Sequence, residues 1–178
     1  VAGALNGAKL IIQGGGATGT AHAGHYAGAG AKTPAMGGYG VGALYNMGID
    51  VAHGLYCVDI SAFDGVSFWA KLTQTNGGNK AGNQLSVNFV LPETNAASVG
   101  GDCPDASMKC YNHPRKTITL TTNWTQYTVM FAEATGGSAS VHGRIQAVAY
   151  LSPDSAWDYS IDEIQLFKGA APAGPAGP

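Results

Sequence analysis

Hydrophobic and polar residues alternate along much of the chain, and a period of two is typical of half-buried β-strands. The clearest run places Leu85, Val87, Phe89 and Leu91 at alternate positions, with Gln84, Ser86, Asn88 and Val90 between them. Strands are expected at residues 9–13, 39–47, 55–59, 66–71, 84–91, 116–121, 126–131, 144–151 and 159–167. No long segment shows the period of a helix, so the pattern predicts an all-β protein.

The last expected strand breaks its own alternation. Ile161 falls on one face of this strand, whereas Ile164 and Leu166 fall on the other. Both apolar sets can face one core only if the strand accommodates an extra residue near positions 162–163. This pattern predicts a β-bulge, which changes the direction of a side chain.

Short segments rich in Gly, Asn and Pro separate the expected strands, as they do in an antiparallel β-sandwich. The 178 residues suit one such domain, and we assign residues 1–168 to it. Its beginning, residues 1–38, is rich in Gly and Ala and is expected to be irregular in part. Residues 169–178 contain only Gly, Ala and Pro, so they are expected to form a linker to a neighbouring domain.

The charge of the chain argues against two classes of function. Lys and Arg number 9 and Asp and Glu number 11, which gives a formal net charge of −2. Because there is no basic excess and no Lys/Arg cluster, neither a nucleic-acid partner nor a membrane-surface helix is expected. No apolar run is long enough to form a transmembrane helix.

Two of the three cysteines, Cys103 and Cys110, lie in one polar segment that is expected to form a surface loop. We interpret them as a disulfide, which would stabilise the domain by closing this loop. The alternative is a metal clip with His113, although zinc prefers closer cysteines and no second ligand pair follows. A disulfide indicates an oxidising compartment, so the protein is expected to be secreted. Cys57 lies in an expected strand and is interpreted as a small buried hydrophobe.

The residues that most often carry catalysis show no organised pattern. No Gly-x-Ser-x-Gly segment is present to hold a nucleophilic serine. Glycoside hydrolysis needs two acids in one cleft, and no motif joins the acids of this chain. His22 and His25 are close in sequence, but their spacing places them on opposite faces of a strand. The sequence therefore predicts a protein that is not an enzyme.

The polar faces of the expected strands carry the candidates for ligand binding. With the apolar sets facing one core, the residues that project outward include Trp69, Lys71, Ser86, Asn88, Gln126, Arg144 and Gln146. An aromatic plane among such side chains suits a sugar, which stacks its C–H face on the ring and forms hydrogen bonds through its hydroxyls. Trp157 is a second candidate, either as a binding platform or as a lid. The alternative for Trp69 is burial under a loop, and Trp124 is interpreted as structural.

Four segments resemble, in the same order, parts of bacterial secreted carbohydrate-binding modules. They are residues 59–71, the loop from 101 to 110, residues 120–131 and residues 159–167. The first, Asp-Ile-Ser-Ala-Phe-Asp-Gly-Val-Ser-Phe-Trp-Ala-Lys, looks like a strand of these modules, and the last is similar to their closing strand. The resemblance implies a jelly-roll β-sandwich of the kind attached to polysaccharide-degrading enzymes.

The resemblance also implies a metal ion. Such modules often hold a structural calcium ion between the acidic end strand and an acid near the N-terminus. Asp162 matches the first of these acids, whereas residues 1–49 contain no Asp or Glu, so backbone carbonyls would have to replace the second.

We therefore expect non-catalytic binding of a polysaccharide, of the β-glucan or xylan type, that targets an attached domain to it. The alternative is a structural subunit of an extracellular assembly or filament with the same fold, which leaves self-assembly open. Retention on insoluble polysaccharide would favour the first, and polymers seen by electron microscopy would favour the second.

Overall fold

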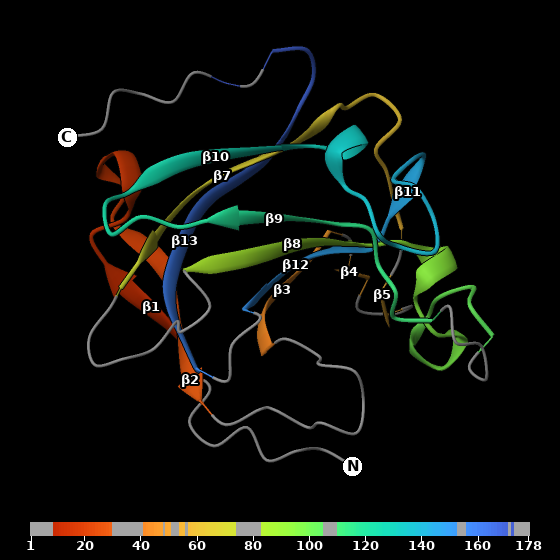
Figure 1. Ribbon diagram of the computed structural model, residues 1–178, viewed down its shortest axis with the longest axis horizontal. Helices are drawn as coiled ribbons and strands as arrows, with labels where there is room; N and C mark the ends of the chain where they lie inside the picture. The colour runs from red at the N-terminus through yellow and green to blue at the C-terminus, as the bar shows by residue number, and fades with distance from the viewer. Residues whose placement is uncertain are drawn as a thin grey trace.

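The computed structural model describes residues 9–29, 41–47, 49–50, 54–55, 57–73, 83–104, 110–152, 156–170 and 172. Named strands pair antiparallel in two main sheets, which lie over one another in Figure 1. The five-stranded sheet has the order β1 (Lys9–Gly14), β2 (His22–Ala29), β13 (Ala156–Phe167), β7 (Gly65–Leu72) and β10 (Thr125–Met130). The four-stranded sheet has the order β3 (Val41–Asn46), β12 (Ala147–Ser152), β8 (Gln84–Val90) and β9 (Arg115–Thr119).

The two sheets pack their apolar faces against each other around one core. Phe68 of β7 and Tyr150 of β12 are both fully buried, and their ring centroids lie 4.8 Å apart across the core. Phe89 and Tyr159 join the same cluster. Because alternate residues of each strand face this core, the structure confirms the all-β antiparallel sandwich that the sequence predicts.

The two ends of the sandwich carry different connections. In Figure 1, β1, β2 and the β9–β10 connection lie toward the left. The short pairs β11 (Arg144–Ile145) with β6 (Val58–Asp59) and β4 (Ile49–Asp50) with β5 (Gly54–Leu55) lie toward the right, as does the long β8–β9 connection. The helices of the described residues are single 3₁₀ turns: η1 (Ala17–Gly19), η3 (Pro92–Thr94), η4 (Ala97–Val99) and η5 (Phe131–Glu133). Within the ranges given above, no helix has the length and apolarity needed to cross a membrane.

Most expected strands occur within a few residues of their predicted positions, and three expectations need correction. The strand β2 was not expected, because its sequence contains Tyr26 as its only large hydrophobic residue and shows no alternation. Residues 144–151 form two strands instead of one, since Gln146 separates β11 from β12. Residues 55–59 likewise contribute to β5 and β6, and Cys57 between them is a partly buried free thiol. Most of the expected linker, residues 171 and 173–178, lies outside the described ranges.

The predicted bulge in the last strand is confirmed. The pairing of β13 with β7 changes register between Asp162 and Gln165. Glu163 takes a positive φ of 47°, a conformation that L-residues adopt rarely. The extra residue lets Ile161 face the core before the bulge while Ile164 and Leu166 pack against the same core after it.

The predicted disulfide is also confirmed. The sulfurs of Cys103 and Cys110 are bonded, with the two Cα atoms 5.6 Å apart. The metal clip with His113 is therefore wrong, because both thiols are used in the bond. The imidazole Nδ1 of His113 lies 2.7 Å from the hydroxyl oxygen of Thr94 instead, and this contact joins the two ends of the disulfide-containing connection.

Candidate ligand-binding surface

The residues predicted to bind a ligand do not form one surface. Trp69, Lys71 and Gln126 lie on the outer face of the five-stranded sheet, because they alternate with core residues of β7 and β10. Ser86 and Asn88 lie on the outer face of the four-stranded sheet, on the opposite side of the sandwich. The backbone of Trp157 belongs to β13, but its side chain lies outside the part that the structure describes.

Trp69 is buried, which corrects its assignment as the exposed stacking platform. Only 6% of the residue is accessible. Its cross-strand neighbours are Gln126 on β10 and Asp162 on β13, so it occupies the centre of the outer face. A ring with so little free area has no face to offer a sugar, and the alternative stated for this residue, burial, is the one the structure shows.

The partly exposed tryptophan on this face is Trp124. It lies in the β9–β10 connection, where the Thr121 hydroxyl donates to the Asn123 carbonyl at 2.9 Å. The backbone N–H of Thr121 donates to the Tyr127 hydroxyl at 3.1 Å, which ties the start of this turn to the following strand. These bonds fix the turn that carries the indole.

Lys71 places its charge on this tryptophan. Its ammonium nitrogen lies 4.7 Å from the centroid of the Trp124 ring, within the range of a cation–π interaction. Gln126, two residues beyond Trp124, adds an amide that is only partly buried. We call Lys71, Trp124 and Gln126 the indole patch. It offers an aromatic plane, an ammonium donor and an amide, the chemistry that the sequence assigned to Trp69. Trp124 itself was interpreted as structural, and its place in a polar turn, Thr-Thr-Asn-Trp, was the available signal for exposure.

Gln146 and Arg144 lie at the other end of the sandwich. Gln146 is 1% exposed; its amide oxygen accepts a hydrogen bond from Asn95 Nδ2 at 2.8 Å, and its amide nitrogen donates to the Gly100 carbonyl. It fastens the disulfide-containing connection to the sheet and is not part of an outward polar face. Arg144 is exposed and lies 3.5 Å from the Asp102 carboxylate, so its guanidinium reaches the same connection.

Ser86 and Asn88 form hydrogen bonds with each other along β8. The Asn88 amide nitrogen donates to the backbone carbonyl and to the hydroxyl of Ser86, both at 3.0 Å. Asn88 is 6% exposed, so its side chain is largely removed from solvent. These bonds use the Asn88 N–H donors within its own strand, and burial keeps the side chain away from a ligand.

Asp162 anchors the connection between β1 and β2. Its Oδ2 atom accepts hydrogen bonds from the Ala17 N–H at 2.9 Å and from the Thr20 hydroxyl at 2.6 Å. The neighbouring Glu163 accepts one from the Thr18 hydroxyl at 2.7 Å. Two carboxylates and two hydroxyls are hard oxygen donors of the kind that calcium prefers, so the residues fit such an ion in type. In the described ranges no third acid, His or Cys joins them, and calcium at this site stays a prediction.

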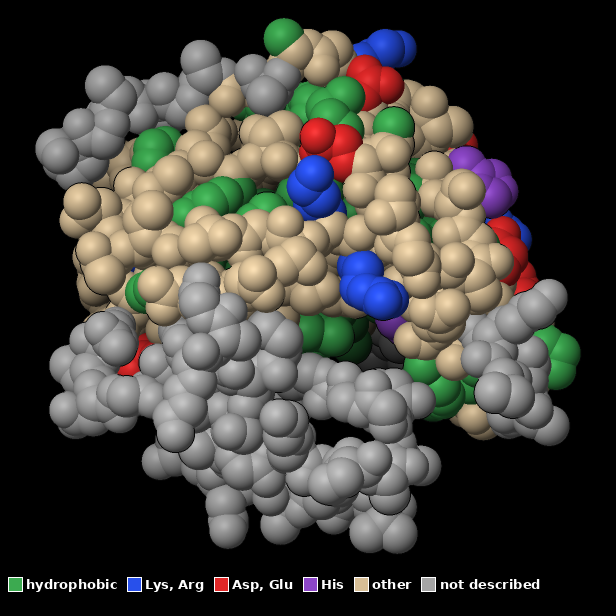
Figure 2. Space-filling view, viewed as in Figure 1, with side chains coloured by type: hydrophobic (Ala, Val, Ile, Leu, Met, Phe, Trp, Pro, Cys, Tyr) green, Lys and Arg blue, Asp and Glu red, His purple; other side chains and the backbone are tan. Residues whose placement is uncertain are grey.

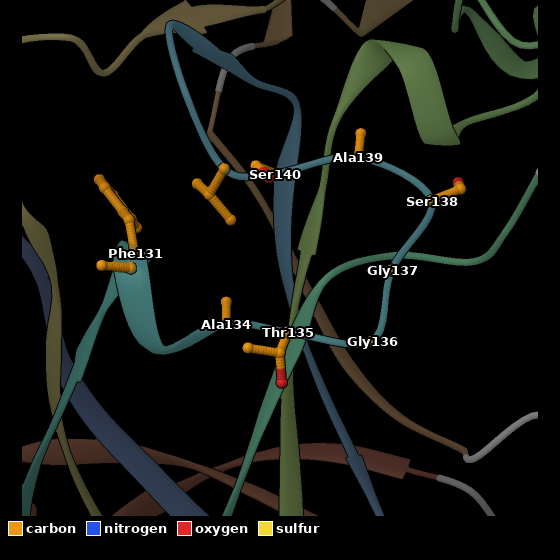
Figure 3. Close-up of a pocket in the computed structure, with 10 residues that line it drawn as sticks. Phe131, Ala134, Thr135, Gly136, Gly137, Ser138, Ala139 and Ser140 are labelled. Carbon is orange, nitrogen blue, oxygen red and sulfur yellow. The ribbon is translucent and has the colours of Figure 1, made fainter.

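One hollow of about 440 Å³ lies within the loop that follows β10, from Phe131 to Val141. Figure 3 shows the chain curving around it, with Phe131 and Ala134 on one arm and Ala139 and Ser140 on the other. Its lining consists of small side chains and the one buried ring of Phe131. No charged side chain lines it within the part of the chain that the structure describes, so this lining lacks the convergent polar groups of a ligand site.

The charges on the visible face are dispersed. In Figure 2 the Lys and Arg side chains stand apart or beside Asp and Glu, without a broad area of either sign. Such a surface attracts neither polyanions nor polycations strongly. It is compatible with an uncharged ligand.

No protein-family model matches the sequence, and no curated protein matches it either. Solved structures match its fold. The solution structure of CtCBM11 gives a TM-score of 0.57 at 14% sequence identity, over 93% of this chain and 84% of that one. The family 11 carbohydrate-binding module of a cellulosomal cellulase of Clostridium thermocellum gives 0.50 at 13% identity, over 92% of this chain and 95% of that one.

A third structure, a family 11 module from Clostridium thermocellum in complex with a beta-1,3-1,4-mixed-linked tetrasaccharide, also gives a TM-score of 0.50. Its identity to this chain is 13%, over 91% of this chain and 84% of that one. At such low identity the likeness concerns the fold. It bears out the architecture that the sequence resemblance implied: this chain has the β-sandwich fold of carbohydrate-binding modules.

Proposed function

We propose that this chain is a non-catalytic module that binds a neutral polysaccharide and holds an attached domain close to it. The observation that carries the proposal is the indole patch on a carbohydrate-binding-module fold. A partly exposed indole with an ammonium and an amide beside it supplies both stacking and hydrogen bonds to a sugar. One of the structures that share the fold holds a mixed-linkage tetrasaccharide, which makes mixed-linkage β-glucan the first ligand to test.

Two further observations support the proposal. The Cys103–Cys110 disulfide is compatible with a secreted protein, and a secreted protein would encounter extracellular polysaccharides. The residues from 169 onward consist of Gly, Ala and Pro, a composition suited to a spacer between domains. Tethering would raise the effective concentration of the attached domain at the polysaccharide without any chemistry in this module.

The strength of binding can be bounded from the contact. Stacking one pyranose on the Trp124 indole removes roughly 100 Å² of apolar surface from water, which gives about 2.5 kcal/mol at ~25 cal/mol per Å². Adding a few hydrogen bonds and subtracting the cost of association leads to a Kd of roughly 10 μM to 1 mM. The alternative candidate ligand is xylan.

Affinity electrophoresis and calorimetry on mixed-linkage β-glucan and xylan test the proposal. Trp124→Ala is expected to weaken binding at least tenfold, and Lys71→Ala less. Tyr111→Ala is a matched control, because Tyr111 is an exposed aromatic residue in the disulfide-containing connection. If no polysaccharide binds the unmodified chain, the proposed function is wrong. If Trp124→Ala and Tyr111→Ala bind equally well, the function stands but the indole patch is not its site.

A further inference from the structure

A second hollow, of about 420 Å³, opens between β1, β2 and the bulge of β13 on one side and β3 on the other. Its volume lies in the lower part of the range of small-ligand pockets. The residues that shape it are Ile12, His22, Gly24, Tyr26, Tyr45 and Glu163, and we call it the tyrosine cleft. None of them belongs to the indole patch.

The cleft lies where, among the described residues, nothing covers the core side of the five-stranded sheet at its edge. Ile12 of the edge strand β1 pairs with Gly24, and Gly24 pairs with the buried core residue Ile161. Paired residues point to the same face of a sheet, so Ile12 lies on the core side. It is nevertheless 66% exposed. An exposed isoleucine on the core side forms an open apolar wall.

Gly24 keeps the floor of the cleft free. A Cβ atom at this position would lie 3.1 Å from the Tyr45 hydroxyl oxygen and 3.1 Å from the ring of Tyr26, closer than most such contacts. The two tyrosines therefore approach the strand at the one place where no side chain blocks them. They come from opposite sheets and close the core below the hollow.

The tyrosine pair leaves one hydroxyl proton available. Tyr26 donates a hydrogen bond to the Tyr45 hydroxyl oxygen at 2.7 Å. Burial raises the pKa of both residues above the usual value, so both hydroxyls stay protonated at neutral pH. Two hydroxyls carry two protons and one proton bridges them, so the other can be donated to a ligand.

The charged residues at the cleft define its ligand. Glu163 accepts a hydrogen bond from Thr18 through Oε1, and its second oxygen can accept from a ligand hydroxyl. Among the described residues the lining contains Asp162 and Glu163 but no Lys or Arg, so an anionic ligand would be repelled. An apolar wall, a hydroxyl donor and a carboxylate acceptor suit a neutral polyhydroxylated ring.

We propose that the tyrosine cleft is a second saccharide site that takes one or two neutral pyranose units. The inference rests on the proposed function for its ligand class, but it concerns different residues. It predicts two independent binding events per chain, one at the indole patch and one at the tyrosine cleft.

Cellobiose and laminaribiose are the probes, with glucuronic acid as the charged comparison. Ring signals of ¹³C-labelled tyrosine, followed by NMR, report on the cleft. Tyr45→Phe removes one of the two hydroxyls of the pair and should raise the Kd obtained from the disaccharide-induced shifts at least fivefold. Ile12→Thr changes an exposed residue on an edge strand, so the variant should fold. It should raise the Kd obtained from the disaccharide-induced shifts about threefold. Glucuronic acid should bind at least tenfold more weakly than cellobiose.

The two sites can fail separately. Trp124→Ala should reduce retention on mixed-linkage β-glucan while leaving the tyrosine shifts unchanged, and this result would support the cleft. Saturable tyrosine shifts that survive both Tyr45→Phe and Ile12→Thr would overturn it, as would equal binding of glucuronic acid. Retention on polysaccharide without any tyrosine shift would overturn the cleft and keep the proposed function. Tyrosine shifts without retention on polysaccharide would overturn the proposed function and keep the cleft.

Discussion

Replacement of Gln146 by Ala separates a structural role from a binding role at a residue that the sequence assigned to the ligand surface. The side chain is buried and bridges Asn95 Nδ2 and the Gly100 carbonyl. Truncation removes both hydrogen bonds. Asn95 Nδ2 loses its acceptor and the Gly100 carbonyl loses its donor. A net hydrogen bond contributes about 1 kcal/mol, and an unsatisfied buried group costs about 1–3 kcal/mol. We expect the free energy of unfolding to fall by about 3 kcal/mol.

This loss is measurable by urea unfolding and by thermal melting followed by circular dichroism. For a domain of this size, 1 kcal/mol corresponds to about 2–4 °C, so the Tm should fall by roughly 6–12 °C. Gln126→Ala is the matched control, because Gln126 is only partly buried and should change stability by less than about 0.5 kcal/mol. Well below the Tm, Gln146→Ala should bind polysaccharide as the unmodified chain does. Weaker binding together with an unchanged Tm would refute this reasoning.

Two further predictions concern pH and metal ions. Burial and the nearby Arg115 charge lower the pKa of His113 from 6.5 to about 4. The folded state therefore favours the neutral imidazole, and up to about 3 kcal/mol of stability should be lost as the pH falls from 6.5 to 4. His113→Gln should flatten this part of a stability-against-pH curve, and an equally steep curve in the variant would contradict the assignment. Calcium should raise the Tm, and Asp162→Asn should abolish the increment; a melting curve insensitive to both EDTA and calcium would leave Asp162 as a hydrogen-bond acceptor only.

The sequence predicts the regular parts of the fold because their information is local. The alternation in residues 84–91 determines which side of β8 faces the core, and Leu85, Val87 and Phe89 are indeed fully buried. The broken alternation after Ile161 likewise predicts the bulge at Glu163. In both cases the side-chain period of two is sufficient, and no knowledge of the neighbouring strand is needed.

The candidate site is less predictable, because exposure depends on what covers a face. Trp69 points away from the core, as predicted, yet it is buried at the centre of the outer face. Trp124, outside the regular alternation, retains accessible area because it lies in a turn. Nor does the alternation of single strands say which outward faces belong to the same sheet. Asn88 and Gln126 therefore satisfy the same local rule and lie on opposite sides of the sandwich.

The bulge of β13 links the outer face to the tyrosine cleft. Asp162, immediately before the extra residue, is the cross-strand neighbour of Trp69 and holds Ala17 and Thr20 of the β1–β2 connection. Glu163, the extra residue, lines the cleft. A regular strand would give consecutive residues strictly opposite faces and would leave the register with β7 unbroken. Glu163 adopts its strained positive φ at this bulge. The bulge lets β13 anchor the β1–β2 connection through Asp162 and keep its apolar residues facing the core. It also places Glu163 at the proposed tyrosine cleft.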